Sequence, residues 1–282
     1  MNTSLTRLFA HAKQKSEKLA MISLYDAPSA TLSCDAGADI LLVGDSMGNA
    51  ILGHDGTVPV TMDAMLHHTG AVVRGVKNSS HPETPVVSDI PFGGFATVER
   101  AVENASMLMR AGASAIKLER AGEGTLAAAR VLVEMGVPVV GHLGYTPQSA
   151  GRFEGVVQGK STEAATRLLE DAKRLEDAGA FAVVLEVVPT EVAKRTTAEL
   201  AISTIGIGAG PHCDAQVLVW HDLVGFSEEK PFRFVKQYAD VYETMKDASA
   251  GFVEEVRSGA FPAPEHGWRM DEEEYRRWEN GG

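Results

Sequence analysis

Eight short apolar runs recur along the chain, separated by segments with helical periodicity. Each run is rich in Val, Ile or Leu and does not alternate with polar residues, which is typical of a parallel strand buried on both faces. Eight such strands with helices between them can close on themselves, so the sequence predicts an α/β fold, a (β/α)8 TIM barrel. A doubly wound open sheet is the alternative. The runs span residues 21–26, 40–45, 85–90, 115–119, 137–144, 181–186, 204–208 and 216–222.

The segments between the runs carry helix start and stop signals. The stretch 97–113 opens on a threonine and reaches Gly112 at its end, and the stretch 161–180 opens on a serine and a threonine and reaches Gly179. Hydroxyl side chains are favoured at helix N-caps, and glycine at the C-terminal end adopts the positive φ that ends a helix. Both stretches are therefore predicted helices that lead directly into the next strand.

The length of the chain suits one large domain. Barrels of this class commonly reach 282 residues without splitting, so we expect a single barrel domain over residues 1–282. The last forty or so residues are predicted to form one or two extra helices at the C-terminal end. The sequence from about 262 to 282 is polar and contains proline, and we expect a loose tail there.

Charge and cysteine content exclude several classes of function. The formal net charge is −12, so the sequence carries no electrostatic footprint for nucleic acid or for an anionic membrane. The two cysteines cannot build a disulfide framework or a zinc cluster. The sequence contains no apolar run of about 18 residues and no apolar leader, which argues against a membrane span and a signal peptide. We therefore expect a cytoplasmic protein.

Polar and ionisable residues gather where the predicted strands end, which is where such barrels carry their active sites. Several of them are acids, and like charges on one small rim repel each other. A hard divalent cation relieves that repulsion, and oxygen-only ligation favours Mg²⁺, which keeps waters and shares its site with an oxygen-rich substrate. The residues are Asp45, Ser46, Asp89, Lys117, Glu119, His142, Glu186, His221 and Asp222.

Each of these residues also has an ordinary structural explanation. A single aspartate after a strand, such as Asp45 or Asp89, is often a helix N-cap or a turn former. Lys117 would serve equally well as the partner of a neighbouring acid or as a substrate contact, and His142 alone would fit a hydrogen-bonded core histidine. Helix caps do not need to share a rim, however, so the gathering over several strands favours a functional site. The glycine-rich stretch 206–210 is explained by a tight turn as well as by a phosphate loop.

Nine sequence blocks, in order over roughly residues 20 to 225, resemble the ketopantoate hydroxymethyltransferase family. Together they are highly specific, although a short block such as GDSMG alone would be a poor signal. The blocks read YDAPSA, LVGDSMGNAILGHDGTVPVT, HHTGAVVRG, SDIPFGGF, MRAGASAIKLE, PVVGHLGYTPQS, VQGK, VLEVVPTEVAKR and IGIGAGPHCDAQVLVWHD.

The resemblance implies a barrel that binds Mg²⁺ and transfers a hydroxymethyl group from 5,10-methylenetetrahydrofolate to 3-methyl-2-oxobutanoate through an enolate, giving 2-dehydropantoate for pantothenate synthesis. It implies Glu186 as the base and His142 as a further active-site residue. It also implies a large homo-oligomer, typically a decamer. The residues implied around the metal are Asp45, Asp89 and Glu119, and those implied to hold the keto acid are Asp45, Ser46, Asp89 and Lys117.

The chain departs from the family pattern in loops that would shape the folate and keto-acid pockets. Arg120 and Ala121 stand where the family usually has two glycines, and the stretch 150–156 appears shorter than usual and is altered. Two alternatives therefore stay open: a related Mg²⁺-dependent barrel of the phosphoenolpyruvate mutase and isocitrate lyase type, or a catalytically silent paralogue that binds a keto acid. A Schiff-base aldolase using Lys117 is remote, because the neighbouring acids would keep that lysine protonated.

Overall fold

A computed structural model describes residues 5–152, 155–228 and 230–281 of the chain. The chain divides into two compact units, of which the first comprises residues 1–223 with 231–236 and the second comprises 224–230 with 237–282. The first unit is the barrel. The expectation of one domain over residues 1–282 stays a prediction, as does that of a loose tail from about residue 262.

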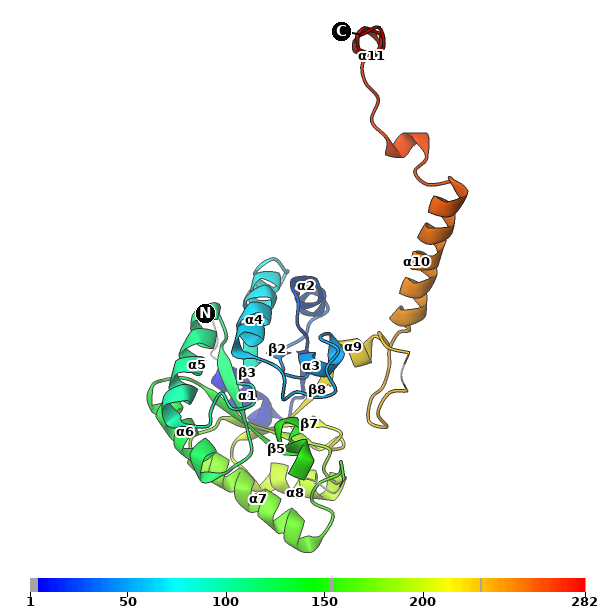
Figure 1. The fold of residues 1–282 in the computed structure, drawn as a ribbon. Coiled ribbons are helices and arrows are strands. Elements are labelled where there is room, and N and C mark those ends of the chain that lie inside the picture. Colours follow the sequence, from blue (N-terminus) through cyan, green and yellow to red (C-terminus); the bar gives the residue numbers. More distant parts are fainter. Residues whose placement is uncertain (1–4, 153–154, 229, 282) are drawn as a thin grey trace. The chain divides into compact units, whose positions relative to one another are not determined.

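Eight parallel strands form a closed barrel in sequence order, and the last strand pairs with the first (Figure 1). The predicted (β/α)8 TIM barrel is therefore confirmed, and the open sheet is excluded. All eight apolar runs became strands, with ends shifted by a few residues. The strands are β1 (Leu19–Ser23), β2 (Ile40–Val43), β3 (Val86–Asp89), β4 (Ala115–Glu119), β5 (Val139–Gly144), β6 (Ala182–Glu186), β7 (Ser203–Ile207) and β8 (Ala215–Val219).

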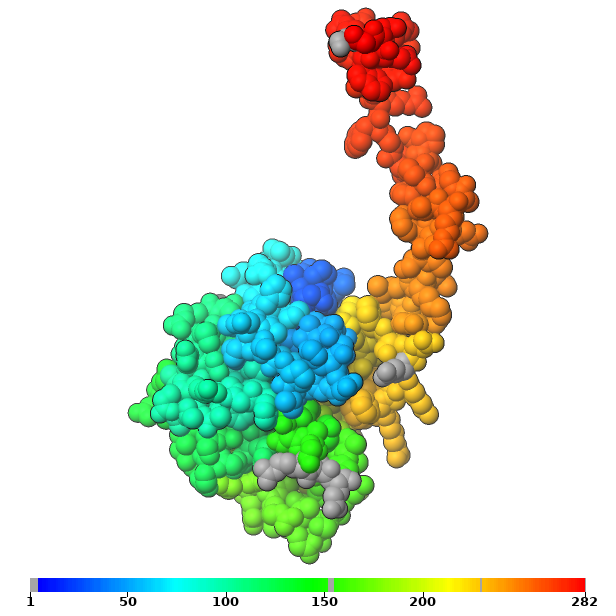
Figure 2. Space-filling view, viewed as in Figure 1, coloured from blue at the N-terminus to red at the C-terminus, as the bar shows by residue number. Residues whose placement is uncertain are grey.

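Helices fill the connections between the strands of this unit. In the space-filling view, the residues coloured from cyan to green, which include α5 and α6, lie together on one flank of the barrel (Figure 2). The helices are α1 (Leu5–Lys15), α2 (Ala27–Asp35), α3 (Met47–Ala50), α4 (Met62–Lys77), α5 (Val98–Ala111), α6 (Glu123–Glu134), the 3-10 turn η1 (Pro147–Arg152), α7 (Thr162–Asp177), α8 (Thr190–Glu199) and α9 (Trp220–Leu223).

The cap signals of the two predicted helices are confirmed. The Thr97 hydroxyl accepts a hydrogen bond from the Arg100 amide at the start of α5, and the Ser161 hydroxyl does the same for the Ala164 amide at the start of α7. At the C-terminal ends, Gly112 has φ 107° and Gly179 has φ 92°, in the left-handed region that favours glycine. These ends set the angle at which each helix returns the chain to the barrel.

The interior of the barrel is apolar near the amino ends of the strands. One buried cluster joins alternate residues of the strands to Leu5, Phe9 and Ala12 of α1, which closes the amino end of the barrel. The interior residues of four neighbouring strands include Val87, Ala115, Val140 and Val184. Side chains alternate along a strand, so the residue two positions later on each strand faces the same interior. Those later residues are Asp89, Lys117, His142 and Glu186, at the carboxyl ends of β3 to β6.

The second unit is largely helical. It contains α10 (Val241–Ser258), the 3-10 turn η2 (Pro264–His266) and α11 (Glu272–Glu279). The predicted extra C-terminal helices are therefore present. Helix α10 begins at the N-cap Asp240 and ends at Gly259 with φ 79°. Among the described residues, no helix of either unit is both long and apolar enough to cross a membrane.

Candidate active site

Five ionisable side chains are almost completely buried at the carboxyl end of the barrel. Each is at most 5% exposed, although isolated charges are costly to bury. The strand register brings them together, because Asp89 pairs with Lys117 across β3 and β4, and Glu119 with His142 across β4 and β5. The glutamate that ends β6, Glu186, joins them with its side chain 18% exposed. The five buried residues are Asp45, Asp89, Lys117, Glu119 and His142.

Lys117 is the central cation of the cluster. Its Nζ atom lies 3.0 Å from Asp89 Oδ2 and 3.2 Å from His142 Nδ1. Burial opposes the charge on Lys117, but the nearby acids Asp89, Glu119 and Asp45 outweigh burial and raise its pKa above the ordinary value. Lys117 therefore carries a positive charge here. Of its two expected roles, the pairing with a neighbouring acid is present, and the substrate contact stays a prediction.

Asp45 and Asp89 form a coupled acid pair. The Asp45 backbone amide donates a hydrogen bond of 3.1 Å to Asp89 Oδ2. Burial and the Asp89 carboxylate raise the pKa of Asp45 to about 8, while Lys117 favours the charged form of the acid. Burial also raises the pKa of Asp89, against the direct opposition of Lys117. The two acids therefore titrate as a coupled pair, in which the ion pair with Lys117 favours the charged form of Asp89.

Neither aspartate serves as a helix cap. The N-cap of the short helix α3 is Ser46, and no side chain caps that helix. The Asp45 carboxylate instead accepts a hydrogen bond of 2.7 Å from the Gln148 side-chain amide. The structural explanation by capping is thus wrong for Asp45, and Asp89 is engaged by Lys117 rather than by a turn.

Gln148 connects the acids, and the sequence did not single it out. It lies in η1, where its backbone amide donates to Glu119 Oε2 at 3.1 Å. Its side-chain amide donates to Asp45 Oδ2 and, at 3.0 Å, to the Ile90 carbonyl. One residue therefore fixes two carboxylates that are 74 positions apart in sequence. The block that contains Gln148 was the only available signal, because a glutamine after a strand has no pattern of its own.

His142 lies between two glutamates. Its Nδ1 atom is 3.4 Å from Glu119 Oε1, and its Nε2 atom is 3.1 Å from Glu186 Oε2. Burial and the Lys117 cation both oppose protonation, but the Glu119 and Glu186 carboxylates on either side outweigh them and raise the pKa of His142 to about 9. His142 thus links the glutamate that ends β4 to the glutamate that ends β6.

Ser46 lies on the β1 side of the rim. Its hydroxyl is 2.8 Å from the Tyr25 hydroxyl, and the Tyr25 ring stacks on His221 with ring centroids 5.5 Å apart. Tyr25 was not predicted as a site residue, because the run 21–26 was taken as strand throughout. The prediction that His221 and Asp222 end a strand is wrong: β8 stops at Val219, and both residues belong to α9. Burial raises the pKa of Asp222.

Two strained backbone positions follow the two glutamates directly. Arg120 has φ 71° and Val187 has φ 49°, values that are uncommon for residues other than glycine. The Arg120 amide donates to the His142 carbonyl and the Val187 amide donates to the Ile207 carbonyl, each at 2.8 Å. Such conformations cost on the order of 1–3 kcal/mol each and cluster at functional sites. Here they turn the chain sharply after Glu119 and Glu186.

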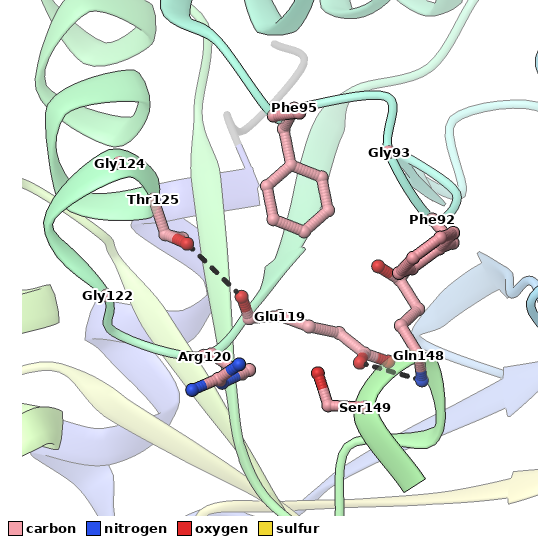
Figure 3. Close-up of a pocket in the computed structure, with 11 residues that line it drawn as sticks. Phe92, Gly93, Phe95, Glu119, Arg120, Gly122, Gly124, Thr125, Gln148 and Ser149 are labelled. Carbon is pink, nitrogen blue, oxygen red and sulfur yellow. Dashed lines mark hydrogen bonds between the residues drawn. The ribbon is translucent and has the colours of Figure 1, made fainter. Parts of the chain in front are cut away.

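A cavity of about 360 Å³ opens beside Glu119 and Gln148. Figure 3 shows Phe95 pointing into it, with Phe92 and Gln148 on one side and Arg120 on the other. Phe92 is 55% exposed, an unusual state for a large apolar ring. The cavity therefore joins the buried acids to a partly aromatic opening. Of the altered stretch 150–156, residues 153 and 154 and the Arg152 side chain lie outside the described residues.

The donor set fits a magnesium ion better than a metal held by protein alone. Within the described part of the chain, no three His, Cys, Asp or Glu side chains are arranged to hold a metal by themselves. Mg²⁺ does not need three, because it usually binds through one or two carboxylates and fills its other positions with water and substrate. Among the described residues, Asp89 Oδ1 and Glu119 Oε1 are buried without a hydrogen-bond partner. A hard cation would satisfy both oxygens.

Comparison with known proteins shows which family this chain matches. The family model described as ketopantoate hydroxymethyltransferase matches residues 3–264. A 3-methyl-2-oxobutanoate hydroxymethyltransferase from Thermotoga neapolitana is 50% identical over 252 residues, which cover 89% of this chain and 91% of that protein.

Solved structures share the fold at much lower identity. Phosphonopyruvate hydrolase in complex with oxalate and Mg²⁺ has a TM-score of 0.59 at 13% identity, with 93% of each chain covered. A 2,3-dimethylmalate lyase, a member of the PEP mutase/isocitrate lyase superfamily, has a TM-score of 0.57 at 16% identity, covering 99% of this chain and 100% of that chain. At these identities the likeness shows the barrel fold alone.

Proposed function

The chain belongs to the ketopantoate hydroxymethyltransferase family, and we propose that it uses Mg²⁺ to transfer a hydroxymethyl group from 5,10-methylenetetrahydrofolate to 3-methyl-2-oxobutanoate. The observation that carries this proposal is the buried row Asp89, Lys117, His142 and Glu186, which brings an acid, a cation and a base to one place. The reaction asks for these three kinds of group, because an anionic keto acid must be held and then deprotonated next to its carbonyl.

Asp45, Asp89 and Glu119 would surround the metal, which one or two of them would bind directly while water and substrate fill its other positions. Asp89 Oδ1 and Glu119 Oε1, which accept no hydrogen bond among the described residues, support this assignment. The pKa of Asp45 supports it too, because burial and repulsion from Asp89 both raise it. When bound, Mg²⁺ would act as a Lewis acid that draws negative charge onto the keto oxygen of the substrate. Gln148 would keep Asp45 and Glu119 oriented for this purpose, because it donates to both.

Lys117 would bind the carboxylate of the keto acid. Its charge is fixed by the surrounding acids, and without it the acidic rim would repel an anionic substrate. Ser46 would add a hydroxyl contact from the other side of the rim, where Tyr25 orients it. These contacts would hold the keto acid with its reactive carbon toward Glu186 at the end of β6.

Glu186 would remove the proton from C3 of the keto acid. The hydrogen at C3 is weakly acidic because it lies next to a ketone, and a carboxylate close to it can accept the proton. Glu186 is the least buried of the site acids, and His142 Nε2 lies 3.1 Å from it. His142 would hold the glutamate side chain in place and stabilise its charged form until the proton moves.

The enolate of the keto acid would then attack the one-carbon unit of the folate. A new C–C bond forms between C3 and the methylene carbon, and both bonds from that carbon to the two folate nitrogens break. One water supplies the hydroxyl group, and the proton taken from C3 and the second proton of that water end on the two folate nitrogens. The products are 2-dehydropantoate and tetrahydrofolate. The cavity beside Glu119 and Gln148 would admit the folate to the acids of the barrel.

Proton exchange tests this sequence of steps. The wild-type protein with Mg²⁺ and 3-methyl-2-oxobutanoate in D₂O should exchange the C3 proton, and addition of 5,10-methylenetetrahydrofolate should yield 2-dehydropantoate. Glu186→Gln should abolish exchange while keto-acid binding persists. Exchange without transfer would instead favour a related enolising barrel that uses another electrophile. Keto-acid binding without exchange would identify a silent paralogue.

Assembly into a homo-oligomer, a decamer by family resemblance, and a cytoplasmic location complete the proposal. Helix α10 supports assembly, because Met245, Phe252 and Val256 are exposed and recur at spacings of seven and four residues, which places them on one face. Light scattering behind size exclusion measures the assembly directly. A monomer at micromolar concentration would contradict this part of the proposal.

A further inference from the structure

Arg120 lines two cavities at the carboxyl end of the barrel. The first is the partly aromatic cavity that Figure 3 shows beside Glu119. The second has a volume of about 410 Å³ and lies between the turns after β4 and β5 and helix α7. Its polar lining consists mainly of Thr146, Gln158, Arg167, Asp171 and Arg174, together with Arg120.

The second cavity is basic in an otherwise acidic chain. Three of its lining residues are arginines, whereas the chain as a whole has a formal net charge of −12. Arg174 is neutralised, because it pairs with Asp171 at 3.0 Å and with Glu123 at 2.5 Å. In the described part of the chain, no carboxylate forms an ion pair with Arg120 or Arg167. Arg120 is therefore available to an anion, and Arg167, which attracts Glu163 of the same helix without forming an ion pair with it, offers a second guanidinium. The planar forks of both groups match carboxylates well.

The strained backbone at Arg120 indicates that the arginine side chain has a functional role. Its φ of 71° is one that glycine adopts freely, while an arginine is strained there. The conformation is held by the hydrogen bond from its amide to the His142 carbonyl. A glycine would serve the turn at lower cost, so the turn alone does not explain an arginine at this position.

We propose that Arg120 and Arg167 bind the two carboxylates of the glutamyl tail of the folate co-substrate, while Phe92 and Phe95 contact its ring system. This inference rests on the proposed function. A reduced folate joins a flat ring system to a benzoyl group and then to a glutamate, and the two cavities offer aromatic and cationic linings in the same order. The ring end lies beside Glu119 and Gln148, where the one-carbon unit must be delivered. The tail passes Arg120 into the second cavity.

Steady-state kinetics test the tail site with Arg120→Gly, which removes the guanidinium and relieves the strain at this position. The KM for 5,10-methylenetetrahydrofolate should rise about tenfold, the usual effect of losing a charge-assisted hydrogen bond at a half-exposed site. The KM for the keto acid should change less than twofold. Arg167→Ala should raise the folate KM about threefold, since that side chain is more exposed. Arg130→Ala is the matched control, an exposed arginine of α6 that lines neither cavity.

Direct binding shows whether the tail itself is recognised. Equilibrium dialysis compares tetrahydrofolate with tetrahydropteroate, which lacks the glutamate. Wild-type protein should bind tetrahydrofolate about tenfold more tightly, and Arg120→Gly should remove that difference. The tail site alone would be refuted by an active enzyme whose folate KM does not change in Arg120→Gly and whose affinities for tetrahydrofolate and tetrahydropteroate are equal. Glutarate binding that depends on Arg120, with an unchanged folate KM, would also refute it by identifying a site for free dicarboxylates. A wild-type protein that makes no 2-dehydropantoate would instead refute the proposed function.

Discussion

Replacement of Lys117 by methionine should destabilise the metal-free protein in a way that depends on pH. Lys117 Nζ and Asp89 Oδ2 are 3.0 Å apart. At that separation, with an effective dielectric constant of about 20, their attraction is roughly 5–6 kcal/mol. Loss of the cation would leave Asp89 charged and buried beside Asp45 and Glu119. The Asp89 carboxyl group avoids this cost by binding a proton, so the loss of stability cannot exceed the free energy of protonating Asp89.

The largest expected loss of stability is set by the pKa of this aspartate in the unfolded state. An unfolded aspartate has a pKa of about 3.9, so keeping Asp89 protonated at pH 7 costs about 4 kcal/mol, and at pH 5 only about 1.5 kcal/mol. In the variant, the native state would bind one proton more than the unfolded state over this range. Its free energy of unfolding should therefore fall, relative to wild type, by about 1.4 kcal/mol for each pH unit of increase. In the wild type, the Lys117 cation opposes this protonation of Asp89, so the extra slope should be weaker or absent.

Urea denaturation of both proteins in EDTA at pH 5, 6 and 7 measures the difference. The double variant Lys117→Met, Asp89→Asn is the matched control, because it carries no acid at position 89 and should lose the extra slope. A stability difference between Lys117→Met and wild type that is the same at pH 5 and pH 7 would refute the reasoning. So would a double variant as pH-dependent as the single one, since the proton would then bind elsewhere.

Three further predictions concern other parts of the barrel. Mg²⁺ must displace the proton of Asp45, because the pKa of this acid is raised to about 8. Calorimetry should therefore find that the apparent Mg²⁺ affinity rises up to tenfold per pH unit below pH 8 and is constant above it, and an affinity that does not change with pH would contradict this. Gln148→Ala should lower kcat/KM for the keto acid at least tenfold, because Asp45 and Glu119 lose their shared donor, and unchanged kinetics would exclude that role. Phe9→Ala should cost about 3–5 kcal/mol of stability without changing either KM, because Phe9 is buried at the amino end of the barrel, and denaturation with kinetics on the same samples checks both.

The sequence predicted the barrel because each strand is buried on both faces. A strand packed between an apolar interior and a layer of helices must be apolar throughout, and such runs are visible without any tertiary information. The same regularity located the site: Asp89, Lys117, His142 and Glu186 each lie two residues beyond a buried apolar residue of their own strand. Alternation along a strand then fixes the direction of these side chains.

Residues outside the strands could not be located in this way. Gln148 acts from a 3-10 turn, and its partner Asp45 is 103 positions away, a relation that only the closed barrel creates. Tyr25 follows β1 and was counted with the strand, although its hydroxyl meets Ser46 across the rim. The end of β8 was placed too late because Trp220 continues the apolar run, while the backbone already turns into α9. In each case a tertiary contact determines the position of the residue, and the periodicity of the sequence does not reveal that contact.

The distribution of charge explains where anionic substrates can enter an acidic protein. Among the described residues at the carboxyl end of the barrel, the site acids outnumber the cations, so under the proposed function a keto acid would bind at Lys117 and beside the divalent ion that the acids would hold. In the neighbouring cavity at the same end, Arg120 and Arg167 form no ion pair with a described carboxylate. One anion position would therefore be buried and suit a small monocarboxylate, and the other would be open and suit a longer dicarboxylate. Arg120 follows Glu119 directly, so the chain that shapes the buried site also places the outer one.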